Sequence, residues 1–287
     1  MNILVTGSAG QLGLEMRRVA AEQMPQHHWR FTDVAELDIT DAAAVRRAAD
    51  GVDAIVNCAA YTNVDQAEVD TELARRINSD AVRNLALAAA ETGALLIHVS
   101  TDYVFGGTAN TPYTEDSPTC PLGVYGATKL AGEQAIAAAG CRALILRTAW
   151  LWSVHGNNFV KTMQRLMSER DSLRVVIDQV GSPTFAGDLA DVIGRVLALD
   201  PAEQALGIYH YTNEGVCSWY DFAMAIRELI GATRCDLQPC RSSEYPSRVT
   251  RPAYSVLDKS RIRRELGIRI PHWRSSLQRI LTQNTLP

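Results

Sequence analysis

The 287-residue sequence has no long hydrophobic run and no block of like charges. No stretch reaches the ~18 uninterrupted apolar residues of a membrane helix, and no basic leader precedes the first apolar residues, Met1–Val5. We therefore expect a cytoplasmic protein that does not bind a membrane. The net charge is −4 and no five or six charges of one sign follow each other, which argues against nucleic acid as a partner.

Cysteine pairs are also missing. The six cysteines form no CxxC motif and have no histidine-rich surroundings, so both a zinc ribbon and a disulfide framework are poor interpretations. Hydrophobic residues make up 47% of the chain and charged residues 21%, as in ordinary globular proteins. The sequence therefore predicts a folded protein with a large core and free thiols.

In the first half, short apolar runs alternate with helical patterns. The expected strands are Ile3–Thr6, Trp29–Thr32, Ala54–Val56, Leu95–Val99 and Ala143–Leu146. The expected helices are Leu12–Ala21, Ala42–Ala49, Leu73–Ala90 and Lys129–Ala139. Continuous apolar strands that alternate with helices are typical of an α/β fold with a doubly wound parallel (Rossmann) sheet. Ligands bind at the carboxyl ends of such strands, so the residues that follow each strand are the candidates for chemistry.

After Arg147 the pattern becomes less regular. Here we expect helices at Phe159–Glu169, Leu189–Leu199 and Trp219–Ile230, strands at Leu173–Ile177 and Ile208–Tyr211, and loops at Trp150–Asn157 and Pro239–Arg251. Residues 1–150 are therefore predicted to form an NAD(P)-binding domain. Residues 151–287 are predicted to form a smaller substrate-binding lobe, with room for segments of the two to interleave.

Three glycines follow the first strand, at Gly7, Gly10 and Gly13. Glycines at this point allow a tight turn, a close approach of the backbone to a pyrophosphate and close packing of the next helix. The helix that follows directs its free N–H groups and its positive dipole end at the phosphates. The G-x-x-G-x-x-G spacing indicates a reductase or epimerase of the short-chain type and a nicotinamide dinucleotide cofactor.

Asp33 lies 20 residues after Gly13, at the end of the second strand. A carboxylate there hydrogen-bonds a ribose 2′-OH and repels a 2′-phosphate, so we expect NADH to serve at least as well as NADPH. Arg17 and Arg18 could still accommodate the phosphate, which leaves use of both cofactors open. We also assign to the cofactor site Gln11, Leu12, Asp38, Ile39, Ala59, Ala60, Tyr61, Asn78, Tyr125 and Lys129.

Tyr125 and Lys129 are four residues apart, so both face the same way on a helix. An ammonium beside a phenol lowers the phenol pKa from its ordinary ~10. This arrangement predicts a general acid that protonates a developing alkoxide. The hydroxyl of Thr101, after the fourth strand, is placed to share the carbonyl oxygen of the substrate.

Longer phrases of the sequence resemble the dTDP-4-dehydrorhamnose reductases, within the extended short-chain dehydrogenase/reductase family. The resemblance runs from Met1 to about Asp258 and is carried by Asn57–Asp65, Ser100–Gly107, Tyr125–Glu133, Arg147–Trp150, Gly156–Phe159 and Asp178–Thr184. It implies reduction of the C4 ketone of dTDP-6-deoxy-L-lyxo-4-hexulose to dTDP-L-rhamnose, with NAD(P)H as reductant. It implies Thr101, Tyr125 and Lys129 as the catalytic set. It implies a sugar pocket lined by Thr62, Val64, Thr101, Asp102, Tyr103, Tyr125 and Trp150.

Some family members form dimers through a magnesium site built from glutamates. Glu15 suits such a site, but Asp188 and Asp191 stand where a glutamate is expected, and the tail Thr282–Pro287 has no acidic residue. Magnesium is therefore doubtful, and a homodimer stays open.

Several alternatives to this reductase remain. They are a 4-ketoreductase of another dTDP-deoxysugar pathway, a nucleotide-sugar epimerase or dehydratase, and a non-catalytic NADP-binding regulatory subunit. For the diphosphate of the sugar nucleotide, the candidates are Arg241, Arg248 and Arg251, because a guanidinium matches phosphate bidentately.

Overall fold

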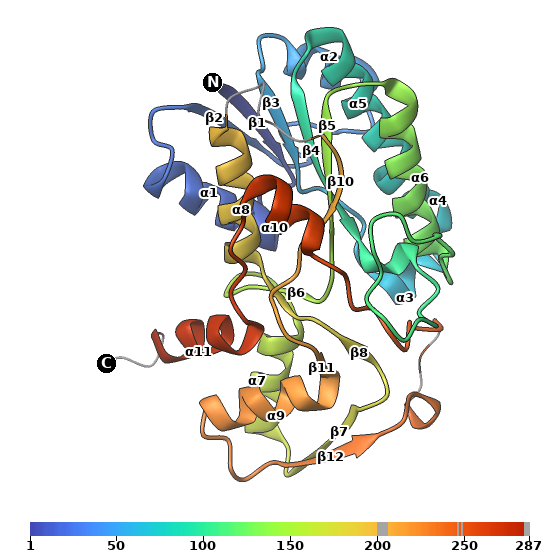
Figure 1. The fold of residues 1–287 in the computed structure, drawn as a ribbon, viewed down its shortest axis with the longest axis vertical. Coiled ribbons are helices and arrows are strands. Elements are labelled where there is room, and N and C mark those ends of the chain that lie inside the picture. The colour runs from blue at the N-terminus through green and yellow to red at the C-terminus, as the bar shows by residue number, and fades with distance from the viewer. Residues whose placement is uncertain (200–205, 246, 248, 284–287) are drawn as a thin grey trace.

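The computed structural model describes residues 1–199, 206–245, 247 and 249–283. Its centre is a sheet of six parallel strands in the order β10-β5-β4-β3-β1-β2 (Figure 1). The strands are β1 Asn2–Thr6, β2 His28–Thr32, β3 Ala54–Asn57, β4 Leu95–Thr101, β5 Ala143–Thr148 and β10 Gly207–His210. The chain goes from β1 to β2 on one side and then returns to β3 on the other. The predicted doubly wound sheet is confirmed, and its order reverses between β1 and β3, where such folds bind ligands.

Helices cover both faces of the sheet (Figure 1). One layer contains α1 Gln11–Glu22, α8 Ala186–Ala198 and α10 Ser260–Leu266, and the other α2 Ala42–Ala49, α5 Ala81–Thr92 and α6 Val124–Ala139. Each layer forms its own hydrophobic core with the sheet, which explains why β3 and β5 are buried along their whole length.

The helix predicted at Leu73–Ala90 is wrong as a single regular element. The chain forms α3 Val64–Ala67 and α4 Thr71–Arg75, and a π-helical turn, Arg76–Asp80, then leads into α5. The wider turn contains Asn78, whose buried amide bonds the backbone of Tyr61. Single π-helical turns often occur at functional sites.

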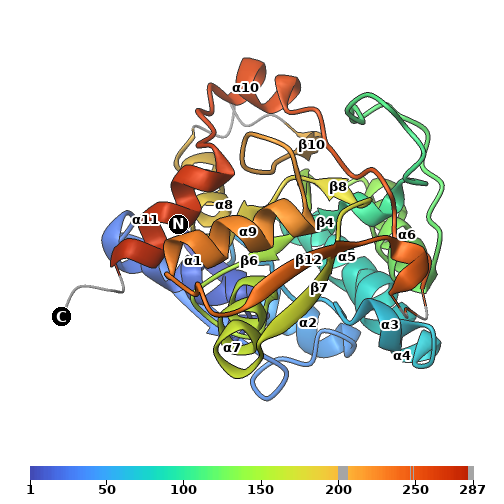
Figure 2. The ribbon, with the colours of Figure 1, turned by 90° about the horizontal axis from the view of Figure 1, so that it is seen from below.

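The second half adds a smaller lobe below the sheet (Figures 1 and 2). Its helices are α7 Phe159–Glu169, α9 Trp219–Leu229 and α11 Trp273–Gln283. Its strands are β6 Leu151–Trp152, β7 Ser172–Val176, β8 Val180–Gly181, β9 Thr184–Phe185, β11 Cys217–Ser218 and β12 Asp236–Cys240. All of these elements except β8 share a third core rich in aromatic side chains, which include Trp152, Phe222 and Trp273.

The two halves interleave, because α8, β10 and α10 follow residue 150 in sequence yet pack on the parallel sheet. The division at residue 150 stays a proposal. The loop predicted at Pro239–Arg251 is wrong at its start: Pro239 and Cys240 end β12, which pairs with β7 in a two-stranded sheet. Proline is tolerated in such a strand because one edge is left unpaired.

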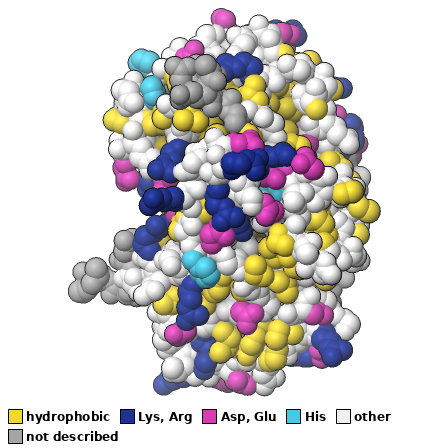
Figure 3. Space-filling model, in the orientation of Figure 1, with side chains coloured by type: hydrophobic (Ala, Val, Ile, Leu, Met, Phe, Trp, Pro, Cys, Tyr) yellow, Lys and Arg dark blue, Asp and Glu magenta, His cyan; other side chains and the backbone are white. Residues whose placement is uncertain are grey.

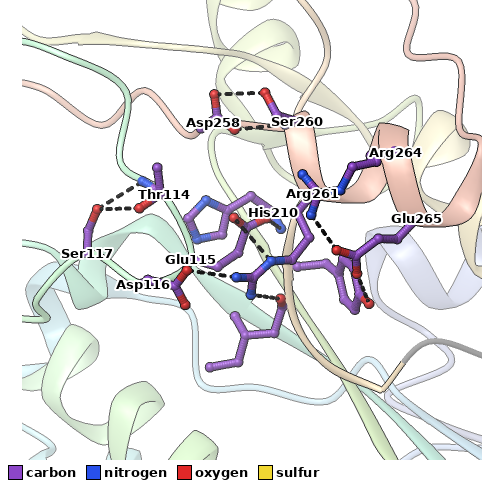
Figure 4. A network of polar contacts seen from close by, with 12 residues as sticks. Thr114, Glu115, Asp116, Ser117, His210, Asp258, Ser260, Arg261, Arg264 and Glu265 are labelled. Atoms are coloured by element: carbon purple, nitrogen blue, oxygen red, sulfur yellow. Dashed lines mark hydrogen bonds and ion pairs between the residues drawn. The ribbon is translucent and has the colours of Figure 1, made fainter.

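Polar contacts attach α10 to the loop at residues 113–117 (Figure 4). Arg261 donates to Asp116 and to the carbonyl of Ile208 on β10, and the Glu115 carboxylate accepts the backbone N–H of His210. These contacts cover β10, which is an edge strand of the sheet.

On the face shown in Figure 3, basic side chains gather near the middle of the molecule, with acidic side chains between them. The arginines of α10 and α11 are paired: Arg263 with Glu214, Arg264 with Glu265, and Arg279 with Asp188. Within the described ranges, no helix is both long enough and apolar enough to span a lipid bilayer.

Candidate active site

Two adjoining cavities open at the carboxyl ends of the sheet strands. The tyrosine cavity, about 440 Å³, lies over β4 and α6 and contains Tyr125. The Asp33 cavity, about 400 Å³, lies beside β2. Gly10, Cys58 and Ala60 line both, so the two cavities meet at the glycine loop and the loop after β3. Together they form the extended site that a dinucleotide beside a second ligand needs.

The glycine loop fits tightly against the loop after β3. Gly7 has a φ of +66°, and a Cβ there would come within 2.5 Å of the backbone nitrogen of Ala59. A Cβ on Gly13 would lie 2.4 Å from the carbonyl oxygen of Gly7. Only glycine satisfies both positions, and the loop then leads into α1, whose first residues, Gln11 and Leu12, line the tyrosine cavity.

Asp33 stands where the sequence predicts, at the end of β2 and in the wall of its cavity. Its carboxylate accepts the backbone N–H of Ala9, at 3.0 Å, and that of Val34, at 2.9 Å. The other predicted cofactor residues in this wall are Gly7, Gly10, Asp38, Ile39, Ala59 and Ala60.

The two arginines of α1 have different positions. The Arg17 guanidinium donates to the Ser8 hydroxyl in the glycine loop and lies 4.5 Å over the ring of Phe31. Arg18 binds Glu15 and Asp191. Arg17 is therefore the arginine that adjoins the nucleotide loop.

Tyr125 and Lys129 lie one turn apart on α6, and both line the tyrosine cavity. The Lys129 Nζ donates to the carbonyl of Val99, at 2.7 Å, and lies 3.4 Å from Nε2 of His98. Burial lowers the pKa of Lys129 to about 8. Burial also raises the pKa of Tyr125 above its ordinary value, although a hydrogen bond with Thr101 acts in the opposite direction. The predicted lowering of the Tyr125 pKa is therefore wrong in this structure, because burial is the largest effect on this pKa and raises it.

Thr101 ends β4 and enters a short 3-10 turn, Asp102–Val104. Its hydroxyl donates to Oδ1 of Asp102, at 3.0 Å, and accepts the N–H of Tyr103. Asp102 is 3% exposed, and burial raises its pKa to about 7. All three residues line the tyrosine cavity, as predicted from the strand end.

An aromatic pair closes the far wall of the tyrosine cavity. Trp150 has a φ of +50°, an uncommon value for a residue with a side chain, and it stacks on Trp219 with ring centroids 3.6 Å apart. Backbone strain of this kind persists where the surroundings enforce it, and functional sites often hold it. Sequence reasoning missed Trp219, which lies 69 residues further along the chain and was assigned only to a helix start. It also missed the roles in this wall of Thr148, Leu151 and Asn157.

Three predicted cofactor residues lie behind the cavity walls. Gly13 packs against the glycine loop, and the Asn78 amide bonds the backbone of Tyr61 and the Thr128 hydroxyl. The Tyr61 hydroxyl donates to Asp70. These residues shape the loop after β3 and do not line either cavity.

The predicted diphosphate arginines are spread along the loop after β12. Arg251 donates to Asp65, and its other Nη lies 3.5 Å from the Tyr103 hydroxyl at the edge of the tyrosine cavity. Arg241 is exposed and does not line that cavity. Arg248 lies outside the described residues.

The carboxylates considered for magnesium have other partners. Glu15 accepts from Arg18 and from the Ser153 hydroxyl, and Asp191 accepts from Arg18 and Gln23. Asp188 is paired with Arg279 on α11. In the described part of the chain, no three acidic, histidine or cysteine side chains come together as a metal site.

The family model described as the RmlD substrate binding domain matches residues 1–286. The chain is 41% identical over 289 residues to the dTDP-4-dehydrorhamnose reductase of Burkholderia thailandensis, with 96% of each chain covered. It is 42% identical to a probable dTDP-4,6-dihydroxy-2-methyloxan-3-one 4-ketoreductase of Streptomyces antibioticus, covering 97% of this chain and 94% of that relative. The crystal structure of a Bacillus anthracis dTDP-4-dehydrorhamnose reductase in complex with NADP superposes with a TM-score of 0.92, at 36% identity and 99% coverage of each chain.

These matches span both the parallel sheet and the smaller lobe. They confirm the resemblance that the sequence motifs indicate. The chain belongs to the RmlD substrate-binding domain family, together with the dTDP-4-dehydrorhamnose reductases.

Proposed function

We propose that this protein reduces the C4 ketone of dTDP-6-deoxy-L-lyxo-4-hexulose with NAD(P)H and releases dTDP-L-rhamnose. The observation that carries the proposal is the convergence of Thr101, Tyr125 and Lys129 on one cavity that adjoins a glycine-lined nucleotide cavity. A proton donor therefore stands beside the place where a hydride donor fits. The relatives named as dTDP-4-dehydrorhamnose reductases support the choice of substrate.

The walls of the two cavities fit a nicotinamide dinucleotide. Gly7 leaves a cradle that a Cβ would fill, the N-terminus of α1 offers free N–H groups for the pyrophosphate, and Asp33 lies where a ribose is read. When bound, the reduced cofactor supplies the hydride. Tyr125 and Lys129 would hold its nicotinamide ribose.

Tyr125 is the proposed proton donor. Reduction of a ketone needs an acid that still holds its proton when negative charge develops on the carbonyl oxygen. Burial keeps the pKa of Tyr125 above its ordinary value, so the phenol is protonated at neutral pH. The Thr101 hydroxyl donates to Asp102 in this structure; with substrate bound it would instead donate to the same carbonyl oxygen and stabilise its charge.

The sugar is proposed to lie between the 3-10 turn and the tryptophan wall. Asp102 and Tyr103 offer polar groups on one side, and the stacked Trp150–Trp219 pair offers an apolar face for the C6 methyl group. Arg251, beside Tyr103, is the candidate for the diphosphate. Thr62 and Val64 complete the opening of the cavity.

Cofactor choice, metal and assembly follow from the same residues. Asp33 favours NADH or use of both cofactors, and Arg17 beside the glycine loop would admit the 2′-phosphate of NADPH. The crystal structure of a relative contains NADP, which supports the use of NADPH as well. Magnesium stays doubtful, as in the sequence, and a homodimer stays open; both questions concern the carboxylates of Glu15, Asp188 and Asp191.

The test is a spectrophotometric assay on a panel of dTDP-4-keto-6-deoxy sugars. The oxidation of NADPH or NADH is followed by the loss of its absorbance. We expect dTDP-6-deoxy-L-lyxo-4-hexulose to have the highest kcat/KM. The rate of Tyr125→Phe should be about 10²–10⁴-fold lower, which is the usual contribution of general acid catalysis. The variant should bind the cofactor like the unmodified enzyme. If Tyr125→Phe keeps more than about a tenth of the normal kcat, Tyr125 is not the proton donor.

A 4-ketoreductase of another deoxysugar pathway is the second candidate, because the Streptomyces antibioticus relative is 42% identical and its name gives a different keto sugar. The same panel separates the two, since that enzyme would prefer the other substrate. A non-catalytic NADP-binding subunit would consume no cofactor with any sugar.

A further inference from the structure

The first turn of α6, which carries Tyr125, receives no cap from the residue before it. The first N–H groups of a helix have no partner within the helix, and a Ser, Thr, Asp or Asn at the preceding position usually binds one of them. Here that position is Gly123, which has no side chain to offer. Tyr125 is the second residue of the helix, so the place of its phenol depends on this turn.

Glu68 supplies the cap from another part of the chain. It directly follows α3, which lies beside the start of α6 (Figure 1), and it precedes Val124 by 56 residues. Oε1 of Glu68 accepts the backbone N–H of Val124, at 2.7 Å. A negative group at this end of a helix is also favoured by the helix dipole.

Gly123 gives this carboxylate its space. A Cβ on Gly123 would lie 2.6 Å from Oε1 of Glu68 and 3.3 Å from a methyl carbon of Val249. The φ of Gly123 is −151°, an extended value that any residue adopts, so the backbone conformation does not require glycine here. The glycine therefore suits a cap that comes from a neighbouring segment.

Two further contacts hold the same turn from other sides. The Tyr125 carbonyl accepts from the Thr128 hydroxyl, at 3.0 Å, and that hydroxyl accepts from the buried Asn78 amide, at 3.2 Å. The Tyr125 ring packs edge-on against Tyr103, with ring centroids 5.4 Å apart. These contacts fix the carbonyl and the ring, whereas Glu68 is the partner on the N–H side of the turn.

The segment that carries Glu68 is itself fixed. Asn63 caps α3 by accepting the backbone N–H of Gln66, at 3.0 Å, and the side chain of Gln66 donates to Asp70. Val64, the first residue of α3, lines the tyrosine cavity. Glu68 therefore joins one wall of that cavity to the helix that carries the tyrosine.

We propose that Glu68 is a positioning residue, which caps α6 and thereby holds the Tyr125 phenol where the carbonyl oxygen of the sugar binds. The proposal rests on the proposed role of Tyr125 as proton donor. Glu68 is exposed and lines neither cavity, so its effect on the reaction passes through α6. A misplacement of about 1 Å can cost about 100-fold in rate, which makes a loosened first turn measurable.

Steady-state kinetics test this role. Glu68→Ala removes the acceptor and should lower kcat about tenfold, with the KM values for cofactor and sugar within about twofold of normal. Glu68→Gln should recover most of the lost kcat, because its amide oxygen can accept the same N–H. Glu72→Ala is the matched control, since Glu72 is also exposed, on α4, and binds Arg75.

We expect Glu72→Ala to leave kcat unchanged. A kcat in Glu68→Ala above about half the normal value would overturn the proposal. So would an equal loss in Glu68→Gln, or a higher KM for the sugar without a loss of kcat.

A cap built into α6 itself gives a sharper test. In the Glu68→Ala background, Gly123→Ser places an ordinary cap residue before the helix, and kcat should rise again about fivefold. Gly123→Ala in the same background is the control, because it adds the same Cβ without an acceptor. Equal kcat values for the two double variants would contradict the capping role.

Hydrogen exchange separates this proposal from the proposed function, because it needs no substrate. The Val124 amide, followed by NMR on ¹⁵N-labelled protein, should exchange about tenfold faster in Glu68→Ala than in the unmodified protein or Glu72→Ala. If the unmodified protein reduces no sugar, the proposed function fails, while the exchange still shows whether Glu68 caps α6. Equal exchange of Val124 in all three proteins would refute the proposal even if the enzyme is active.

Discussion

Replacing Glu133 by glutamine should destabilise the protein strongly although the two side chains have the same shape. Glu133 lies one turn after Lys129 on α6 and accepts from the Arg147 Nε, at 3.0 Å, and Nη2, at 2.6 Å. The Ser100 hydroxyl on β4 donates to the same carboxylate. Both members of the ion pair are 3% exposed, so Glu133→Gln leaves the Arg147 guanidinium buried without a counter-charge.

Removing one partner of a buried ion pair costs about 3–5 kcal/mol, because the remaining charge is desolvated and uncompensated. The amide oxygen of glutamine still accepts one hydrogen bond, which places the expected loss near the lower limit, about 3 kcal/mol. An exposed pair on α7 gives the scale for comparison. Glu169 and Arg165 are 50% and 60% exposed, four residues apart, and such pairs contribute about 0.3–0.5 kcal/mol.

The assay is urea unfolding at pH 7, followed by tryptophan fluorescence and circular dichroism, for the unmodified protein, Glu133→Gln and Glu169→Gln. Glu133→Gln combined with Arg147→Met should recover part of the lost free energy, since it leaves no lone buried charge. A cost below about 1 kcal/mol for Glu133→Gln would show that the pair does not hold α6 against β4 and β5 as the structure indicates.

Three further predictions concern the two cavities. Asp33→Asn should raise the NADPH-to-NADH ratio of kcat/KM by about tenfold or more, ~1.4 kcal/mol, and an unchanged ratio would mean that Asp33 does not read the ribose. Trp219→Leu should raise the KM for the dTDP-sugar by about tenfold and leave the KM for the cofactor unchanged, because it removes an aromatic wall from the sugar side only; equal effects on both would contradict this. Lys129→Met should raise the free energy of unfolding at pH 7, since the folded protein holds this lysine at a pKa of about 8 and the unfolded chain at ~10.4. Between those values the unfolded state binds more protons, so the unmodified protein gains stability as pH rises and the variant's advantage should shrink; an advantage independent of pH would refute the cause.

Local signals in the sequence predicted most of the sheet and most of the site. Gly7, Asp33, Thr101 and Tyr125 each follow a strand or begin a helix, and parallel strands bring such positions to one edge. Their juxtaposition therefore follows from the α/β alternation alone. The family phrases added the substrate, which no single residue could have indicated.

Contacts between segments that are distant in the sequence could not be predicted from local patterns. Trp219 reaches the tyrosine cavity only because α9 packs against Trp150, and its place at a helix start carries no such signal. Pro239 suggested a loop, yet β12 pairs with β7 along one edge, and proline is tolerated because the other edge of β12 is unpaired. Burial decided the pKa of Tyr125, and the spacing to Lys129 says nothing about burial.

Transfer of a label to the sugar tests the central proposal most directly. The enzyme is incubated with dTDP-6-deoxy-L-lyxo-4-hexulose and cofactor deuterated at the hydride position, and the product is analysed by NMR and mass spectrometry. We predict dTDP-L-rhamnose with one deuterium at C4, and almost no product from Tyr125→Phe. Deuterium at another carbon, a product of the opposite configuration at C4, or no transfer at all would contradict it.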